Sequence, residues 1–365
     1  MAPARFAFRC RPFTRQLQAW ALAAAGLCSL SLAPSAQALT FSFRDVGATP
    51  MSALQLAAFQ TAGDYWSRQL NDPVTVYIDI AFDNLGSGIL GSASANFTSA
   101  PYSTVRSALV ADVRSATDRS AVTSLQAGPA LSFMATQGDL SSRFDNDGSL
   151  NNTLLGLTTA NAKALGLPVA SGVNNPDASI SFANAFSASF SYTREGGVPG
   201  NQIDFITVAQ HEIGHALGFT SGVDDIDFCA LNNFGVCGLP NSVERFESNW
   251  WYEPLDLFRY SSAGLDMRVG GGPFLSVDGG LTAVELFSTG RFNGNGSQAS
   301  HFGTGALNLM RPFVGYGQAY DATTSDLVAF DAIGWDLATP VPEPGRLGLM
   351  GAGVLLLFVA RRRRQ

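Results

Sequence analysis

The chain has 365 residues, of which 46% are hydrophobic and 14% are charged, and its formal net charge is −7. This composition is too apolar for an intrinsically disordered protein, and the length allows roughly two domains. Every acidic residue except Glu343 lies between residues 39 and 340, so the central part of the chain is strongly acidic. Acidity argues against nucleic acid as a partner and against docking on an anionic membrane surface, because both require basic patches.

A secretory signal peptide is predicted at residues 1–38. Residues 1–16 are basic, residues 17–33 are apolar, and Ala36-Gln37-Ala38 forms a small-x-small cleavage pattern. A membrane anchor is the alternative, but the apolar run is short and ends in this pattern. We expect signal peptidase to cleave after Ala38 and to release an exported chain.

Hydrophobic periodicity predicts several helices and strands in the exported chain. Helices are expected at 51–70, 102–125 and near 158–165, and strands at 73–82, 179–182 and 186–192. A Gly/Ser-rich loop is expected up to about residue 98, and a variable loop region at 139–176. A helix from an Asp204 cap to Leu217 follows, and then little helical periodicity occurs until about 322–333.

The segment Asp145-Asn146-Asp147-Gly148-Ser149 resembles the start of a calcium-binding loop. A complete loop of this kind carries Glu at its twelfth position, where this chain has Gly156. A structural Ca²⁺ ion is one expectation for this segment, and a solvated turn is the alternative.

The helix at 204–217 contains the motif His211-Glu212-Ile213-Gly214-His215. Residues four apart lie on one side of a helix, so both imidazoles can reach one Zn²⁺ ion at about 2.0–2.1 Å. Glu212 can then act on water at the metal without filling a coordination position. The alternative is a pair of core histidines. Apolar flanks, a helix-ending Gly218 and the presence here of two of the three histidines favour the zinc site.

The third zinc ligand is not determined by this motif. In the compact metzincin pattern HExxHxxGxx(H/D) it would be Ser221, which is a poor zinc ligand. A glutamate further along the chain is one alternative, and the remaining histidine is another. The candidates are therefore His301, Glu244, Glu247 and Glu253.

The order of these motifs resembles that of leishmanolysin-type metzincins, which are zinc metalloproteases. In that family a HExxHxxGF helix is separated by an insertion from a Ser-His-aromatic segment, and a Leu-Met-x-Pro Met-turn and a final helix follow. The matching segments here are His211–Phe219, Ser300–Phe302, Leu309–Pro312 and Asp331–Trp335. The resemblance covers roughly residues 178–336, and the N-terminal part is similar to bacterial metalloproteases that carry a PEP-CTERM tag.

The resemblance implies an α+β fold with a mixed twisted sheet, an active-site helix and an irregular C-terminal subdomain that ends in a helix. It implies a metalloprotease domain at 39–340, with an N-terminal subdomain at about 39–218 and a C-terminal subdomain at about 219–340. One catalytic Zn²⁺ ion would be bound by His211, His215 and His301, and Met310 would form the hydrophobic floor below it.

The implied function is a zinc-dependent endopeptidase that hydrolyses peptide bonds of a protein or peptide substrate, with Glu212 as the general base for zinc-activated water. The alternatives are a catalytically silent zinc-binding extracellular protein and a zinc amidohydrolase with a non-peptide substrate. Tyr316 is a candidate transition-state donor. The strand near 179–186 is either an edge strand that pairs with an extended substrate or an interior strand.

Residues 341–365 resemble the PEP-CTERM sorting signal of Gram-negative bacteria. Val341-Pro342-Glu343-Pro344 precedes an apolar stretch at 347–360, interpreted as a transmembrane helix, and an arginine run at 361–364. The resemblance implies export across the inner membrane, processing by an exosortase, membrane contact only through this tail, and a final location at the cell surface or outside the cell. An ordinary C-terminal anchor is the alternative.

Two cysteines remain in the exported chain, Cys229 and Cys237. In an oxidising compartment, this spacing predicts a disulfide that closes a loop. Two free buried thiols are the alternative.

Overall fold

The structure, a computed structural model, describes residues 39–230, 237, 246–247 and 251–338. The predicted signal peptide at 1–38, the sorting tail at 341–365 and Glu244 lie outside the described residues. Within the described ranges, no helix is long and apolar enough to cross a membrane.

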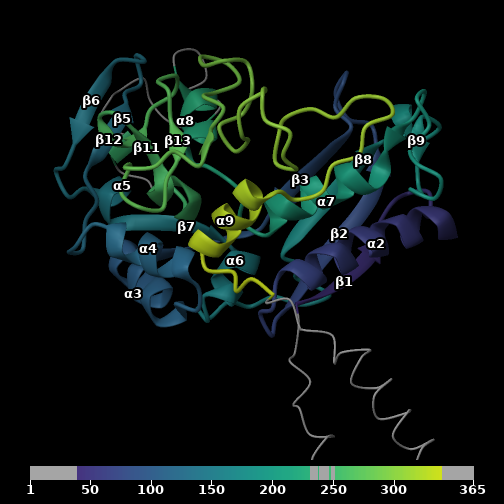
Figure 1. Cartoon of the computed structure of the whole chain (residues 1–365), viewed down its shortest axis with the longest axis horizontal. Helices are drawn as coiled ribbons and strands as arrows, with labels where there is room; N and C mark the ends of the chain where they lie inside the picture. Colours follow the sequence, from purple (N-terminus) through teal and green to yellow (C-terminus); the bar gives the residue numbers. More distant parts are fainter. Residues whose placement is uncertain (1–38, 231–236, 238–245, 248–250, 339–365) are drawn as a thin grey trace, which may run out of the picture. The chain divides into compact units, whose positions relative to one another are not determined.

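A four-stranded sheet in the order β1-β2-β8-β3 is the framework of the site (Figure 1). Strands β1 (Thr40–Asp45), β2 (Thr75–Asp83) and β8 (Ala178–Ala183) are parallel, and β3 (Gly91–Ala95) is antiparallel to β8. The expected strands at 73–82 and 179–182 are confirmed. Strand β8 lies between β2 and β3, so the strand near 179–186 is interior and not an edge.

Strand β3 is an edge strand of this sheet. The prediction of a loop up to residue 98 is therefore wrong. Its sequence, Gly-Ser-Ala-Ser-Ala, has low intrinsic β-propensity. All five residues nevertheless pair with β8, whose Ile180 and Phe182 side chains are fully buried. Pairing with a buried neighbour therefore decides the conformation of β3.

Helices α2 (Ala53–Gln69) and α7 (Phe205–Ala216) pack side by side against the sheet (Figure 1) and confirm the helices expected there. Three aromatic rings meet between them, from Phe59 of α2, Phe182 of β8 and Phe205 of α7. Their ring centroids are 4.5–5.7 Å apart. Each such pair stabilises the fold by about 0.5–1.5 kcal/mol beyond burial. The cluster fixes the first residue of α7 relative to the sheet.

A six-stranded sheet in the order β14-β13-β11-β12-β5-β6 combines strands from before and after α7. Its strands are β5 (Phe133–Thr136), β6 (Ser142–Asp145), β11 (Arg259–Ser261), β12 (Gly264–Met267), β13 (Phe274–Leu275) and β14 (Glu285–Leu286). Strand β12 pairs in parallel with β5, so segments on both sides of residue 218 share one sheet. Two smaller pairs join β4 (Phe97–Pro101) to β7 (Leu154–Thr158) and β9 (Phe190–Ser191) to β10 (Ile203–Asp204).

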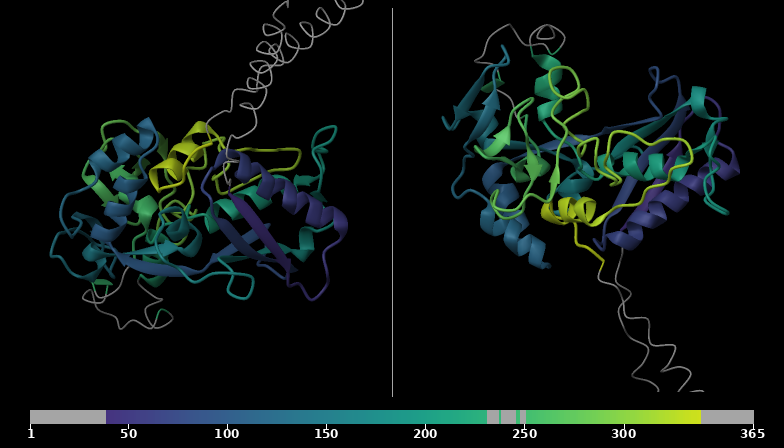
Figure 2. Two further views of the ribbon diagram at one scale, coloured as in Figure 1. Left: turned by 90° about the horizontal axis from the view of Figure 1, so that it is seen from below. Right: turned by 45° about the horizontal axis from the view of Figure 1, so that its top comes forward.

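The remaining described helices are short. They are α3 (Tyr102–Asp112), α4 (Ala116–Ser124), α5 (Leu150–Thr153), α6 (Thr159–Ala164), α8 (Val223–Cys229) and α9 (Thr324–Ala332), together with 3₁₀ turns at Asn184–Phe186 and Pro254–Phe258. Figure 2 shows α9 packed beside α4. The described part of the chain is thus of the mixed α+β class.

Several expected elements differ from the structure for identifiable reasons. The single helix expected at 102–125 is two helices, because the Ser115 hydroxyl accepts a hydrogen bond from Asp118 N at 2.9 Å and starts α4 anew. The strand expected at 186–192 is reduced to β9. The helices expected near 158–165 and 322–333 are confirmed as α6 and α9. No periodicity predicts α8, which lies after the turn that ends α7.

Candidate metal centre

Helix α7 carries the HExxH motif, and local hydrogen bonds define both of its ends. The carboxylate of Asp204 accepts a hydrogen bond from Thr207 N at 2.9 Å, which confirms the predicted N-cap. At the other end, Gly218 has a φ of 111°, and Phe219 N donates to the Gly214 carbonyl at 3.1 Å. This helix ending needs a left-handed residue, and it turns the carbonyl of Phe219 back toward α7.

The two histidines of the motif present their Nε2 atoms to one point. The Nδ1 atom of His211 is bonded to the Leu309 carbonyl at 2.9 Å, and that of His215 to the Phe219 carbonyl at 2.7 Å. A carbonyl only accepts hydrogen bonds, so each Nδ1 carries the proton and each Nε2 has a free lone pair. These two Nε2 atoms are 3.1 Å apart.

His301 brings a third imidazole to the same point. Its Nε2 atom lies 3.1 Å from that of His211 and 3.3 Å from that of His215. Three nitrogens bound to one tetrahedral zinc ion at about 2.0–2.1 Å lie about 3.3–3.4 Å apart. The residues present therefore fit a single Zn²⁺ ion.

Burial keeps the three imidazoles neutral. It lowers the pKa of His211 to about 4 and that of His215 to about 3, and it lowers the pKa of His301 well below its ordinary value. Neutral imidazole is the form that binds zinc, so few protons compete for these nitrogens at neutral pH. The backbone of Gln298 opposes this lowering of the His301 pKa.

The carboxyl group of Glu212 lies in the same cleft, under the edge strand β3. Burial raises the pKa of Glu212 to about 8, while a hydrogen bond to the backbone of Ala93 opposes this shift. A Cβ atom on Gly91 would lie only 2.7 Å from Glu212 Oε1, so a glycine lets the strand pass this close. The Gly/Ser-rich composition predicts a loop at Gly91 and Ala93, so the sequence pattern misses both neighbours of Glu212.

Met310 packs against α7 at Gly214. Its side chain is fully buried, and a Cβ atom on Gly214 would lie 2.6 Å from its Sδ atom. The N–H groups of Leu309 and Met310 both donate to the Asp326 carboxylate of α9, each at 3.0 Å. This is the segment for which a Met-turn is predicted, and its Leu309 carbonyl is the one bonded to the ring of His211.

A cleft of about 650 Å³ contains the three histidines and Glu212. Its walls come from β3 and the loop before it, from residues 220–225 after α7, and from residues 296–301 and 311–314. Tyr316, the candidate donor, is 55% exposed and is not among the residues that line the cleft. Tyr320 lines it instead.

The alternative third ligands make other contacts. Glu253 lines the cleft, but its carboxylate contacts the hydroxyl of Thr220. The carboxylate of Glu247 contacts Arg143. The hydroxyl of Ser221 donates a hydrogen bond to the Asp256 carboxylate at 2.6 Å. Of the described candidates, His301 is the one whose ligand atom joins those of the motif.

A second group of possible metal ligands consists of Asp145, Asp147 and Glu247, whose carboxylate oxygens lie within 4.8 Å of one another. The guanidinium group of Arg143 pairs with Asp145 at 2.8 Å and also contacts Glu247. Gly156, the twelfth position of the supposed calcium loop, lies within β7. An arginine already supplies positive charge to these carboxylates, and calcium binding stays a prediction.

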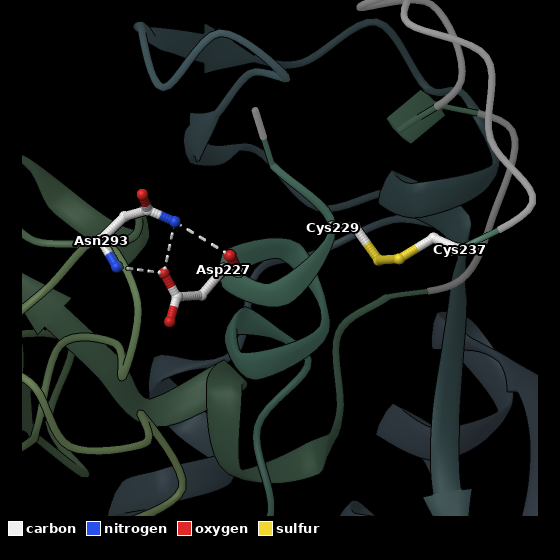
Figure 3. Close-up of a disulfide and its surroundings, with 4 residues drawn as sticks. All are labelled: Asp227, Cys229, Cys237 and Asn293. Atoms are coloured by element: carbon white, nitrogen blue, oxygen red, sulfur yellow. Dashed lines mark hydrogen bonds between the residues drawn. A yellow bond between two sulfur atoms is a disulfide. The ribbon is translucent and has the colours of Figure 1, made fainter. Parts of the chain in front are cut away.

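The predicted disulfide between Cys229 and Cys237 is confirmed (Figure 3). Cys229 is the last residue of α8, so the bond attaches the end of this helix to the chain that follows. Helix α8 also borders the cleft of the candidate metal centre, because its residues Asp224 and Asp225 line that cleft.

Comparisons of the chain with protein-family models, with curated proteins and with solved structures find no match. The functional conclusion therefore depends on the residues of the site itself. The structure brings together His211, His215, His301 and Glu212 in one cleft and packs Met310 against the helix that carries three of them.

Proposed function

We propose that the chain is a zinc-dependent endopeptidase with a metzincin-like fold. The observation that carries this proposal is the convergence of three Nε2 atoms, from His211, His215 and His301, at separations of 3.1–3.3 Å. The buried carboxyl group of Glu212 shares their cleft. This combination would supply a metal site and, in the ionised form of Glu212, a proton acceptor beside it.

The edge strand β3 supports a peptide as the substrate. It is antiparallel to β8, it has no second partner among the described strands, and it lines the cleft beside Glu212. Free backbone N–H and C=O groups on such an edge can pair with an extended peptide. A substrate bound in this way would have its main chain aligned along β3, within reach of the metal centre.

The residues of the chain would divide the chemistry among them. A bound zinc ion supplies Lewis acidity, which polarises a carbonyl group and stabilises negative charge on its oxygen. Glu212 would accept a proton from the attacking water and deliver it to the leaving amine. The three neutral histidines add no charge of their own, so the positive charge of the ion is not reduced by its ligands.

The proposal includes the place of action inferred from the two ends of the chain. Residues 1–38 would direct export, and residues 341–365 would direct sorting and processing at the cell envelope. The disulfide between Cys229 and Cys237 supports an oxidising compartment, because such bonds persist mainly outside the cytosol. A surface or extracellular protease would meet its protein substrates there.

The test compares the full-length protein with its Glu212→Gln variant. Zinc content is measured by elemental analysis, and cleavage by mass spectrometry of a mixed peptide library. We expect both proteins to bind one zinc ion and only the wild type to cut peptides. Zinc binding without any cleavage would instead favour a silent zinc-binding protein or an amidohydrolase with a non-peptide substrate. Absence of zinc binding would reject the proposal.

A further inference from the structure

The third metal-binding histidine lies outside regular secondary structure. His211 and His215 are fixed by α7, whereas His301 lies in a turn just before the isolated bridge between Phe287 and Phe302. The position of the His301 ring therefore depends on the hydrogen bonds that other segments make to the backbone around it.

One carboxylate binds the two N–H groups that directly precede His301. In Asp224 of α8, Oδ1 accepts from Ala299 N at 2.5 Å and Oδ2 accepts from Ser300 N at 3.0 Å. The buried guanidinium group of Arg259 donates from Nη1 to the Ala299 carbonyl at 3.2 Å. Charged partners thus bind both sides of Ala299, and such charge-assisted bonds are roughly twice as strong as neutral ones.

The linker between α7 and α8, which precedes Asp224, is held in place by contacts to the segment at 251–256. The hydroxyl of Ser221 and the N–H of Gly222 both donate to the Asp256 carboxylate, at 2.6 and 2.9 Å. A Cβ atom on Gly222 would overlap the Trp251 carbonyl oxygen at 1.3 Å. The linker is therefore packed without free space, and it gives α8 a defined position relative to the end of α7.

We propose that Asp224 is a positioning residue for His301. By fixing the Ala299–Ser300 backbone relative to α7, Asp224 sets the distance from His301 Nε2 to the other two nitrogens, and so it determines zinc affinity without contacting the metal. This inference rests on the proposed zinc centre. Partners that orient metal ligands from outside the coordination sphere typically contribute about 10–100-fold to metal affinity.

Asp227 provides a matched control on the same helix. Its carboxylate also accepts two backbone N–H groups, from Phe292 and Asn293, each at 2.8 Å. Figure 3 shows that the Asn293 side chain turns back to Asp227 as well, and its Nδ2 atom donates to Oδ1 at 3.0 Å. Asp227 thus makes the same kind of contact as Asp224, but to a segment that ends well before His301.

The experiment compares full-length wild type, Asp224→Asn and Asp227→Asn. In both variants a carboxylate oxygen becomes an NH₂ group that cannot accept the second N–H. The zinc dissociation constant is measured by competition with a chromophoric chelator, and the visible absorption of the Co²⁺-substituted proteins reports the coordination geometry. Urea unfolding of the metal-free proteins measures the general structural cost. Asp224→Glu, which keeps the charge but moves it by one methylene, replaces Asp224→Asn if that variant does not fold.

We expect both variants to lose similar stability, but only Asp224→Asn to raise the zinc dissociation constant by about 10–100-fold and to alter the Co²⁺ spectrum. Wild-type zinc affinity in a folded Asp224 variant would overturn the positioning role alone. An equal loss of affinity in Asp227→Asn would also overturn it, because the effect would then be a general consequence of weakening α8. A wild type that binds no zinc would overturn both this inference and the proposed function.

Discussion

The contact between Gly214 and Met310 gives a quantitative test of how the Met-turn packs on α7. A Cβ atom at position 214 would lie 2.6 Å from the Sδ atom and 3.1 Å from the Cε atom of Met310. Replacing a helical glycine by alanine normally stabilises a protein by about 0.8–1.0 kcal/mol. Forcing an extra methyl group into a packed core costs about 1–3 kcal/mol. We therefore expect Gly214→Ala to destabilise the protein by up to about 2 kcal/mol.

The sign of this effect should reverse when the methionine is shortened. In a Met310→Ala background, the sulfur and terminal methyl group are absent, and the next nearest atom to the new Cβ atom, Phe330 Cζ, lies at an ordinary 3.5 Å. Gly214→Ala should then stabilise the protein by about 1 kcal/mol through helix propensity alone. The coupling between the two positions is the difference, about 1–3 kcal/mol.

Urea unfolding of the wild type, both single variants and the double variant measures this coupling. A chelator is present in every sample, so that zinc binding does not contribute to the free energy of unfolding. The Met310→Ala change alone should cost about 2–5 kcal/mol, so Met310→Val serves if that variant is too unstable. An identical effect of Gly214→Ala in both backgrounds would refute the packing of Met310 against α7.

Three further predictions concern the metal ligand set, the approach of β3 to Glu212, and a buried carboxyl group. In isothermal titration, His301→Ala should weaken zinc binding strongly and Glu253→Gln should not; the reverse result would make Glu253 the third ligand. Gly91→Ala should displace the carboxyl group of Glu212, because its Oε1 would lie 2.7 Å from the new Cβ atom. We expect a lower kcat of peptide cleavage with unchanged zinc content, and an unchanged kcat would contradict the close approach of β3 to Glu212. Burial raises the pKa of Asp72 in the folded protein to about 8. The neutral Asp72 carboxyl group therefore stabilises the fold fully below its unfolded pKa near 4, and this stabilisation is lost as pH rises through about 8. The melting temperature should therefore fall more steeply between pH 5 and 8 in the wild type than in Asp72→Asn, and equal slopes would exclude this assignment.

The helix that carries the motif could be predicted because its determinants are local. Asp204 caps its first turn, an apolar face runs along its length, and Gly218 supplies the positive φ that ends it. All three signals lie within one short stretch of sequence. Strand β3 could not be predicted in this way, because Gly, Ser and Ala do not favour a strand and the conformation comes from pairing with β8.

The same contrast applies to the four residues of the candidate site. His211, Glu212 and His215 follow from one helical motif, and the identity of those residues already specifies their relative positions. His301 lies 86 residues beyond His215, and the sequence leaves it in competition with glutamates such as Glu253. A long insertion costs little in loop-closure entropy, so spacing along the chain does not choose between the candidates.

What selects His301 is a set of backbone contacts that come from distant segments. Asp224 binds the two N–H groups before it, and the Ser288 N–H donates to the His301 carbonyl at 2.9 Å. Immediately after it, the Phe302 N–H donates to the Met310 carbonyl at 2.8 Å. The turn that carries His301 is thus connected to α8 on one side and to the segment of Met310 on the other. Helix α8 follows the turn that ends α7, and Met310 packs against Gly214 of α7. The third ligand is in this sense positioned by the same helix as the first two, through partners that have no pattern of their own in the sequence.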